Sequence, residues 1–355
     1  MSPSEKELVA SRLEAMKGLR DGWQGGSTIP ARWRGFQALQ AIDAMDQVMQ
    51  RKTDSVLLRV GYVKSAPGQA APMRELVGRG SEPHRPFRLH LAALGVAYAT
   101  KRSQVTFTND PGRLPFVSQV VRSRGKPDRW PPSWALLCGL DPAYTDEWQK
   151  DRLRKAFVRL ERAGLVDRDP RGRSTARSGQ VSPWERFRLL VEDGMLDGQG
   201  GPLPWVRPAD KGQTRSSLVK APKGLMKVPA DFWRQGWYLL LERNEIAALF
   251  AFLAHTADLV EQVDADNSVR GIDLGHRYFG ALGLNTRRYR AFNYYLKPFG
   301  LITTVQNEVL PGRARPNPTA AVGKPRRMAL VPKGFQRNAL DTIIDALEKR
   351  QTQLP

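Results

Sequence analysis

Two distant stretches of the chain share one pattern: residues 160–166 read LERAGLV, and residues 296–302 read LKPFGLI. In each, the pattern predicts the end of an amphipathic helix, a glycine in the left-handed conformation that closes a helix, and the immediate start of a strand. Gly164 and Gly300 are these glycines. The repetition predicts two copies of one structural unit.

The sequence around each stretch predicts the same order of elements. In the second copy we expect a helix, an extended segment, two helices and two strands, at residues 244–259, 269–272, 273–282, 286–297, 301–305 and 327–331. In the first copy we expect a helix, a strand, two helices and two strands, at residues 87–100, 104–108, 133–140, 145–163, 165–168 and 184–190. Thr145 and Asn285 are the predicted N-caps of the last helix in each copy. The expected fold is mainly α with small β wings, of the α+β class.

Glycine and proline clusters separate these units from the rest of the chain. They gather at residues 66–86, 193–224 and 311–325, as is typical of linkers and loops. The predicted division is an N-terminal helical segment or arm, partly flexible, a first unit, a Gly/Pro/basic linker, a second unit and a C-terminal helix, at residues 1–86, 87–192, 193–227, 228–334 and 335–355.

The N-terminal segment predicts two helices. Ser4 and Glu7 have the spacing of a capping box, and a set of apolar residues follows on one side of the expected helix: Leu8, Leu13, Met16 and Leu19. A second helix is expected at residues 37–50. The sequence leaves open whether this segment packs on its neighbour or serves as an arm.

The repeated order of elements resembles the winged-helix form of the helix-turn-helix superfamily, in two tandem copies. The resemblance covers roughly residues 87–190 and 228–332. Tandem winged helices are also the architecture of theta-type plasmid replication initiators, which this sequence resembles. The resemblance implies that the third helix of each unit enters the major groove of DNA. It also implies that the loop between the last two strands, the wing, contacts the backbone or the minor groove.

The two third helices have a cationic outer face. At about 100° per residue, one side of each is apolar: Tyr289, Phe292, Leu296 and Phe299 in the second unit, and Leu153, Phe157 and Leu160 in the first. The opposite sides carry the candidate DNA contacts Arg287, Arg288, Arg290 and Tyr294, and Arg152, Lys155, Arg159 and Arg162. Arginine can donate two hydrogen bonds to guanine O6 and N7. A solvated helix side is the alternative interpretation.

Both predicted wings are rich in arginine, glycine and proline. The candidate wing contacts are Arg168, Arg171, Arg173 and Arg177 in the first unit, and Arg313, Arg315, Lys324, Arg326 and Arg327 in the second. Such loops can place guanidinium groups along phosphates or in a narrow minor groove. Incidental charge in a loop is the alternative.

The net charge of the chain favours a polyanionic partner. The 355 residues carry 56 Lys and Arg against 35 Asp and Glu, a formal charge of +21. A surplus of this size attracts nucleic acid, or an anionic membrane surface. The longest apolar stretch, residues 247–254, is far shorter than the roughly 20 residues of a membrane span. Acidic residues near the N-terminus argue against a signal peptide, and Cys138 stands alone.

No catalytic, metal or cofactor site is expected. The four histidines are scattered, and the one cysteine gives no zinc-ligand spacing. Residues 322–325 fail the phosphate-loop pattern because proline follows the lysine. Each notable carboxylate has a structural explanation, although a nuclease could assemble acids from distant positions.

The sequence therefore predicts a non-enzymatic, sequence-specific protein that binds double-stranded DNA. It would act as a transcriptional regulator or as a plasmid replication initiator, with transcription or replication proteins as further partners. We expect it in the bacterial cytoplasm with the nucleoid, in an oligomeric state that the sequence leaves open. The alternatives are a basic structural or RNA- or protein-interaction protein and a metal-dependent nuclease.

Overall fold

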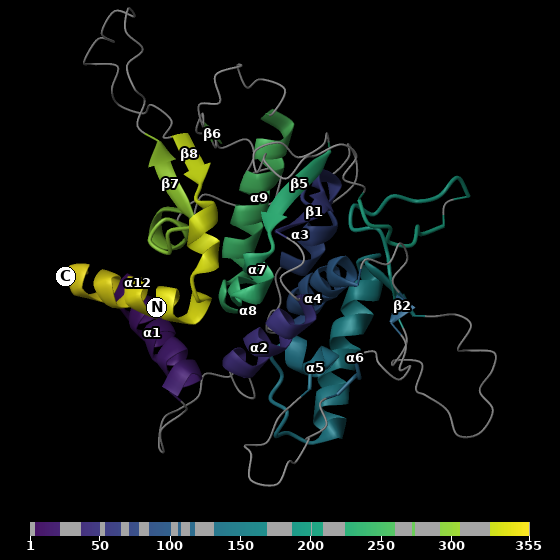
Figure 1. Cartoon of the computed structure of the whole chain (residues 1–355), viewed down its shortest axis with the longest axis horizontal. Coiled ribbons are helices and arrows are strands. Elements are labelled where there is room, and N and C mark those ends of the chain that lie inside the picture. The colour runs from purple at the N-terminus through teal and green to yellow at the C-terminus, as the bar shows by residue number, and fades with distance from the viewer. Residues whose placement is uncertain are drawn as a thin grey trace, which may run out of the picture.

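The computed structural model of the chain describes residues 4–21, 37–49, 54–64, 71–77, 85–100, 106–107, 114–117, 131–168, 187–199, 201–208, 224–259, 272–273, 292–305 and 327–354. Over these residues the protein is mainly helical and has three small antiparallel sheets, as Figure 1 shows. The expected α+β class is confirmed at this level.

The first predicted unit has its elements in the expected order. Their bounds are α4 Arg85–Ala99, β2 Thr106–Phe107, α5 Trp134–Leu137, α6 Asp146–Arg162, β3 Val166–Arg168 and β4 Phe187–Leu189. The three strands form an antiparallel sheet in the order β2-β4-β3. The last strand of the unit therefore lies between the other two.

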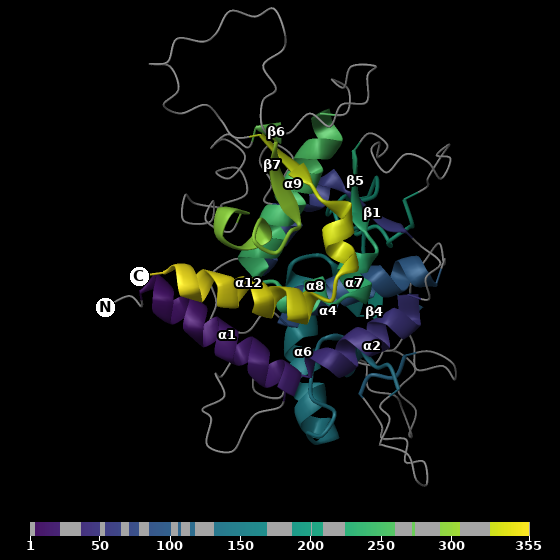
Figure 2. The same cartoon turned by 60° about the vertical axis from the view of Figure 1, so that its left-hand side comes forward.

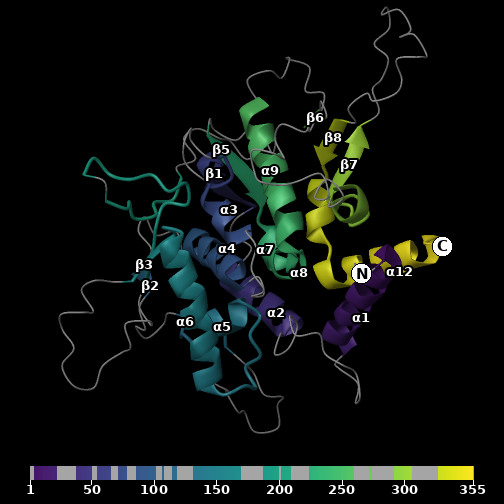
Figure 3. The same cartoon turned by 180° about the vertical axis from the view of Figure 1, so that it is seen from behind.

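The described elements of the second unit repeat this arrangement. Their bounds are α9 Arg243–Leu259, β6 Ile272–Asp273, a π-helical turn η6 Phe292–Leu296, β7 Ile302–Val305 and β8 Arg327–Leu330. The strands form an antiparallel sheet in the order β6-β8-β7, so again the last strand is central. The two sheets lie at opposite sides of the molecule (Figures 1 and 3). Asp273, the expected start of the helix at 273–282, belongs instead to β6, and the rest of that helix and the start of the one expected at 286–297 lie outside the described residues.

The two glycines of the repeated pattern have the predicted conformation. Gly164 has φ 67° and Gly300 has φ 73°. In the first unit the amide of Leu165 donates to the carbonyl of Leu160 at 3.0 Å. The equivalent bond in the second unit, from Leu301 to Leu296, is also 3.0 Å. Both helix ends thus close with the same six-residue hydrogen bond before the chain enters β3 or β7.

The first helix of the N-terminal segment begins at the predicted capping box. The amide of Ser4 donates to Glu7 Oε2 at 2.6 Å, and the amide of Glu7 donates to Ser4 Oγ at 3.3 Å. The elements of this segment are α1 Glu5–Asp21, α2 Ala38–Met49, β1 Ser55–Arg59, a 3₁₀ turn η2 Val60–Tyr62 and α3 Pro72–Val77. Both expected helices are present.

One residue of α1 lies on the wrong face for the prediction. Leu13, Met16 and Leu19 are buried as expected, but Leu8 is 51% exposed. Val9 and Arg12 are buried instead. The guanidinium of Arg12 can be buried because it pairs with Glu245 in α9.

The described parts of the N-terminal segment pack on elements of both units. Helix α1 lies beside the C-terminal helix α12 (Ala339–Gln353), which Figure 2 shows clearly. Strand β1 pairs antiparallel with β5 (Leu225–Pro229), so residues 225–227 of the predicted linker belong to a sheet. Helix α2 packs against α4, α5 and α7 (Asp231–Arg234).

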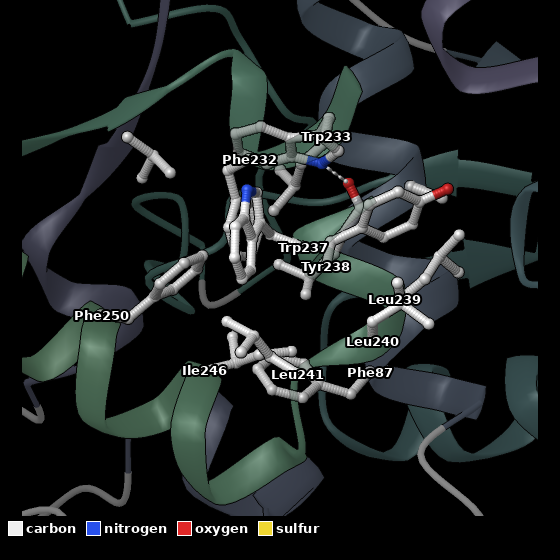
Figure 4. Close-up of a cluster of buried hydrophobic side chains, with 14 of the residues drawn as sticks. Phe87, Phe232, Trp233, Trp237, Tyr238, Leu239, Leu240, Leu241, Ile246 and Phe250 are labelled. Atoms are coloured by element: carbon white, nitrogen blue, oxygen red, sulfur yellow. Dashed lines mark hydrogen bonds between the residues drawn. The ribbon is translucent and has the colours of Figure 1, made fainter. Parts of the chain in front are cut away.

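One hydrophobic core runs through the described elements, and aromatic residues from α7 and α8 (Trp237–Leu240) lie in it (Figure 4). The indole N–H of Trp233 donates to the carbonyl of Leu91 in α4 at 2.7 Å. The hydroxyl of Tyr238 donates to the carbonyl of Leu137 in α5 at 2.8 Å. These bonds satisfy polar atoms that burial would otherwise strand, and they join helices of the two predicted units.

The end of the expected helix at 286–297 departs from α-helical geometry at a proline. Pro298 has no N–H, so the carbonyl of Tyr294 lacks the donor that an α-helix would supply four residues later. That oxygen accepts instead from Nη1 of Arg350 in α12, at 2.6 Å. Pro298 therefore interrupts the α-helical bonding of the last turn, and a side chain from another helix takes the backbone acceptor that is left.

Candidate nucleic-acid interface

Helix α6 presents the first candidate reading face, and its inner side is as predicted. Leu153, Phe157 and Leu160 are buried, and Phe157 stacks on Phe116 with the ring centroids 5.7 Å apart. The hydroxyl of Thr145 accepts from the amide of Trp148 at 3.4 Å, which confirms the predicted N-cap. The helix is thus held by its cap, its core side and the glycine turn that leads into β3.

The outer side of α6 carries the four predicted cations in one stripe. Lys155 and Arg162 are exposed, and Arg152 and Arg159 are half-buried. Lys155 Nζ lies 2.9 Å from the carboxylate of Asp151, an exposed ion pair of small energetic weight. The described structure therefore gathers these four candidates on one helix face.

An aromatic pair that the sequence analysis did not single out extends this stripe beyond the start of α6. The ring of Tyr144 is stacked on that of Trp148, with centroids 4.4 Å apart and planes 24° apart, and Tyr144 is 43% exposed. The guanidinium of Arg152 lies 5.4 Å from the centroid of Trp148. The four-residue spacing of these three side chains was the available signal.

The second candidate reading helix is represented in the described residues by its C-terminal end. Leu296 and Phe299 are buried as predicted, and Tyr294 is 38% exposed, also as predicted. Arg350 lies 4.2 Å from the centroid of the Tyr294 ring, so the aromatic face is partly covered by α12. The other candidates of this helix, Arg287, Arg288 and Arg290, lie outside the described residues.

The wings are described only where they meet the sheets. Arg168 ends β3 opposite Phe187, and Arg327 begins β8 opposite Val305, so the backbone of each residue lies at the base of a wing. The remaining wing candidates lie outside the described residues: Arg171, Arg173, Arg177, Arg313, Arg315, Lys324 and Arg326.

The sheet below the first wing contains an ion pair between neighbouring strands. Arg188 of β4 lies 2.6 Å from the carboxylate of Asp167 in β3, and the two residues are directly opposite in the register. The pair offsets the one acidic residue at the base of this wing. The wing is thereby left with a cationic surplus, because its sequence between β3 and β4 contains four Arg against one Asp and one Glu.

Two ion pairs tie the N-terminal segment to the units that carry these surfaces: Arg12 with Glu245, both buried, and half-buried Arg59 with buried Glu192. Arg12 of α1 donates to both carboxylate oxygens of Glu245 in α9, at 2.5 and 2.9 Å. Arg59 of β1 donates through Nη1 to Glu192 at 2.8 Å and through its backbone amide at 2.9 Å. Removing one member of such a pair typically costs about 3–5 kcal/mol, because the other charge is left buried.

Burial governs the protonation of these carboxylates. It raises the pKa of Glu245, and the attraction of Arg12 opposes this rise only in part. Burial likewise raises the pKa of Glu192 against the attraction of Arg59. For Arg12, burial alone would lower the pKa, but the charge and hydrogen bonds of Glu245 raise it, so the guanidinium stays charged.

Two further buried titratable groups are His90 and Cys138. His90 Nδ1 lies 2.9 Å from the hydroxyl of Tyr62, and burial lowers the pKa of His90 to about 3. Cys138 is buried, and burial raises the pKa of its thiol. Among the described residues no group of three or more His, Cys, Asp or Glu is placed to hold a metal ion. None of the described helices is long and apolar enough to cross a bilayer.

Comparison with known proteins gives no match: no family model fits the sequence, and no curated protein or solved structure is similar to it. The function is therefore argued from the residues and their placement.

Proposed function

We propose that the protein binds double-stranded DNA in a sequence-specific manner with two tandem winged-helix units, without catalysis and without a cofactor or metal. It acts as a transcriptional regulator or a plasmid replication initiator, with proteins of that process as further partners. Its place is with the nucleoid in the bacterial cytoplasm.

The observation that carries the proposal is the repeated strand order. The sheets β2-β4-β3 and β6-β8-β7 both place the last strand in the centre, and in each the strand β3 or β7 begins directly after a helix end closed by Gly-Leu. In a winged-helix unit the helix before this turn is the reading helix, and the loop between the last two strands is the wing. Both positions are rich in arginine in this chain.

The exposed face of α6 supports the same proposal on chemical grounds. An α-helix fits the major groove, and the N-terminal residues of a helix-turn-helix reading helix contact base edges. The stripe from Trp148 through Arg152 and Arg159 offers hydrogen-bond donors for guanine and an aromatic surface for a thymine methyl group. The charge of +21 supplies the sequence-independent attraction to phosphate.

Selection from a random duplex library at near-physiological salt tests the proposal, because non-specific attraction is weak there and base readout survives. We expect an enriched motif of two segments about 34 Å apart, one turn of the duplex. Absence of an enriched motif, together with binding that disappears as salt rises, would contradict the proposal.

The same preparation distinguishes the alternatives. Preferential binding of RNA over the selected duplex would favour an RNA-interaction protein. Cleavage of plasmid DNA that depends on added magnesium would favour a nuclease. We expect the selected duplex to outcompete RNA of equal length, and the plasmid to stay intact.

A further inference from the structure

The first and last described helices of the chain form one support beneath the second unit. Helices α1 and α12 lie side by side (Figure 2). An arginine from each lies against the segment 294–299. Lys17 of α1 lies 2.6 Å from the carboxylate of Glu348 in α12. Arg350 of α12 pairs with Glu5 of α1. The two helices are therefore linked by two ion pairs near the C-terminal end of α12, and we call them the terminal helix pair.

Arg12 of α1 joins the terminal helix pair to the second unit at two points. Its guanidinium makes the bidentate bond to Glu245 of α9 and lies 4.9 Å from the ring centroid of Tyr295 and 5.4 Å from that of Phe299. Tyr295 and Phe299 belong to the end of the second candidate reading helix. A single buried side chain from the start of the sequence is thus held between α9 and that helix end.

Arg350 of α12 reaches the same helix end from the other member of the pair. It donates to the carbonyl of Tyr294, the acceptor that Pro298 leaves without its helical donor. Its guanidinium also lies 4.2 Å from the ring centroid of Tyr294 and 5.5 Å from that of Tyr295. The bond fixes the backbone at the point where the helix loses its own hydrogen-bond pattern.

We infer that Arg12 and Arg350 are positioning residues for the second reading helix, and that α1 is required for the chain to read the second segment of its DNA site. This inference rests on the proposed function. The two arginines contact the reading helix at its buried side and at its backbone, so they set its placement without touching DNA. Small displacements of a contact residue are enough to lose base-specific hydrogen bonds, whose geometry is narrow.

The test compares three full-length variants with the parent chain. The first is Arg12→Met combined with Glu245→Leu, which removes both charges so that none is left buried. The second is Arg350→Gln, at a half-buried position where a milder effect on folding is expected. The control is Arg59→Met combined with Glu192→Leu, the other ion pair of the N-terminal segment, which lies away from Tyr294 and Phe299 in sequence and in contacts.

Each variant is subjected to selection from the random duplex library, and the preference at every base position is recorded. We expect the first two variants to keep the first segment of the motif and to lose preference in the second, with affinity for the full motif about tenfold weaker. The control is expected to keep both segments. Hydrogen exchange should rise at the amides of residues 294–301 in the first two variants and stay unchanged there in the control.

The outcomes separate this inference from the proposed function. A parent chain that selects no duplex motif overturns the proposed function and this inference with it. A parent motif of two segments that both variants retain overturns this inference alone. A loss of preference that is equal in both segments overturns it as well, because it indicates a general loss of folded protein.

Discussion

Gly95 of α4 packs directly against the indole ring of Trp233 in α7, and a Cβ atom at position 95 would lie 2.7 Å from Cδ1 of that ring. Alanine normally stabilises a helix interior by about 1 kcal/mol relative to glycine. Here the added methyl group is expected to destabilise the protein instead. The Trp233 ring is buried and its N–H is bonded to the carbonyl of Leu91, so the ring cannot move aside freely. We expect Gly95→Ala to destabilise the protein by about 1–3 kcal/mol.

Urea unfolding of the Gly95→Ala variant measures this change. Gly198→Ala is the matched control, since no heavy atom lies within 4 Å of the Cβ that it would add. We expect the control to unfold within about 0.5 kcal/mol of the parent. Equal stability of the two variants would show that Trp233 has room to move.

Buried His90 should make the protein less stable in mild acid. The pKa of His90 is about 3 in the folded protein and about 6.5 in the unfolded chain. Between these values the unfolded chain binds the proton, so the stability contribution is complete above pH 6.5 and is lost as pH falls toward 3. The slope approaches about 1.4 kcal/mol per pH unit.

The measurement is urea unfolding at pH 7, 6 and 5 for the parent and for His90→Gln. Glutamine keeps a polar partner for Tyr62 and does not titrate. We expect the variant to be less stable at pH 7 and to lose less stability on going to pH 5. Parallel pH profiles would mean that His90 is not the group that responds.

Residues on the two reading helices should control preference at single base pairs. Replacing Arg152 or Arg290 with glutamine is expected to cost about 1–3 kcal/mol on the selected site and to relax preference at one position. Lys333→Gln is the control, because Lys333 is exposed on the turn before α12 (η8, Pro332–Gln336), outside both candidate surfaces. Fluorescence titration with the selected duplex and its single-base variants measures each effect.

Residues of the wings should act on all DNA alike. Replacing Arg171 or Arg313 with glutamine is expected to weaken selected and random duplexes equally and to reduce the slope of log affinity against log salt by about 1. Titrations at several salt concentrations give that slope. If the wing and helix variants behave in the same way, the assignment of reading helices and wings is wrong.

Tyr144 should contribute to DNA binding more than to folding. Tyr144 is 43% exposed, so Tyr144→Ala removes little buried apolar surface, although the stack on Trp148 is lost. We expect affinity for the selected duplex to fall several-fold, while the free energy of unfolding changes by about 1 kcal/mol or less. Tyr144→Phe keeps the stack and should retain most of the affinity. An unchanged affinity in Tyr144→Ala would place DNA elsewhere on α6.

The parts of the fold that depend on short stretches of sequence were predictable. The cap at Thr145, the inward line of α6 and the left-handed glycines Gly164 and Gly300 each depend on residues within about one or two helical turns. The capping box of Ser4 and Glu7 is equally local. Such features carry their signal in spacing and residue type.

The support of the second reading helix could not be predicted in this way. Arg12 meets Glu245 across 233 residues, and Arg350 reaches a carbonyl that proline leaves available. Neither residue differs in type or spacing from an ordinary surface cation. The pairing depends on tertiary packing, in the same way as the pairing of β1 with β5. Leu8 was assigned to the wrong face for the same reason.

The contact between α1 and α12 also imposes an order in time. Helix α1 is synthesised before every other described helix, and α12 after all of them. At ribosomal rates of about 5–20 residues per second, α1 waits on the order of tens of seconds for its partner. Its apolar side, with Val9, Leu13 and Met16, has no α12 to cover it during that interval. The nascent chain therefore completes the packing around its second unit last. A chain that ends before α12 would leave α1 without its packing partner.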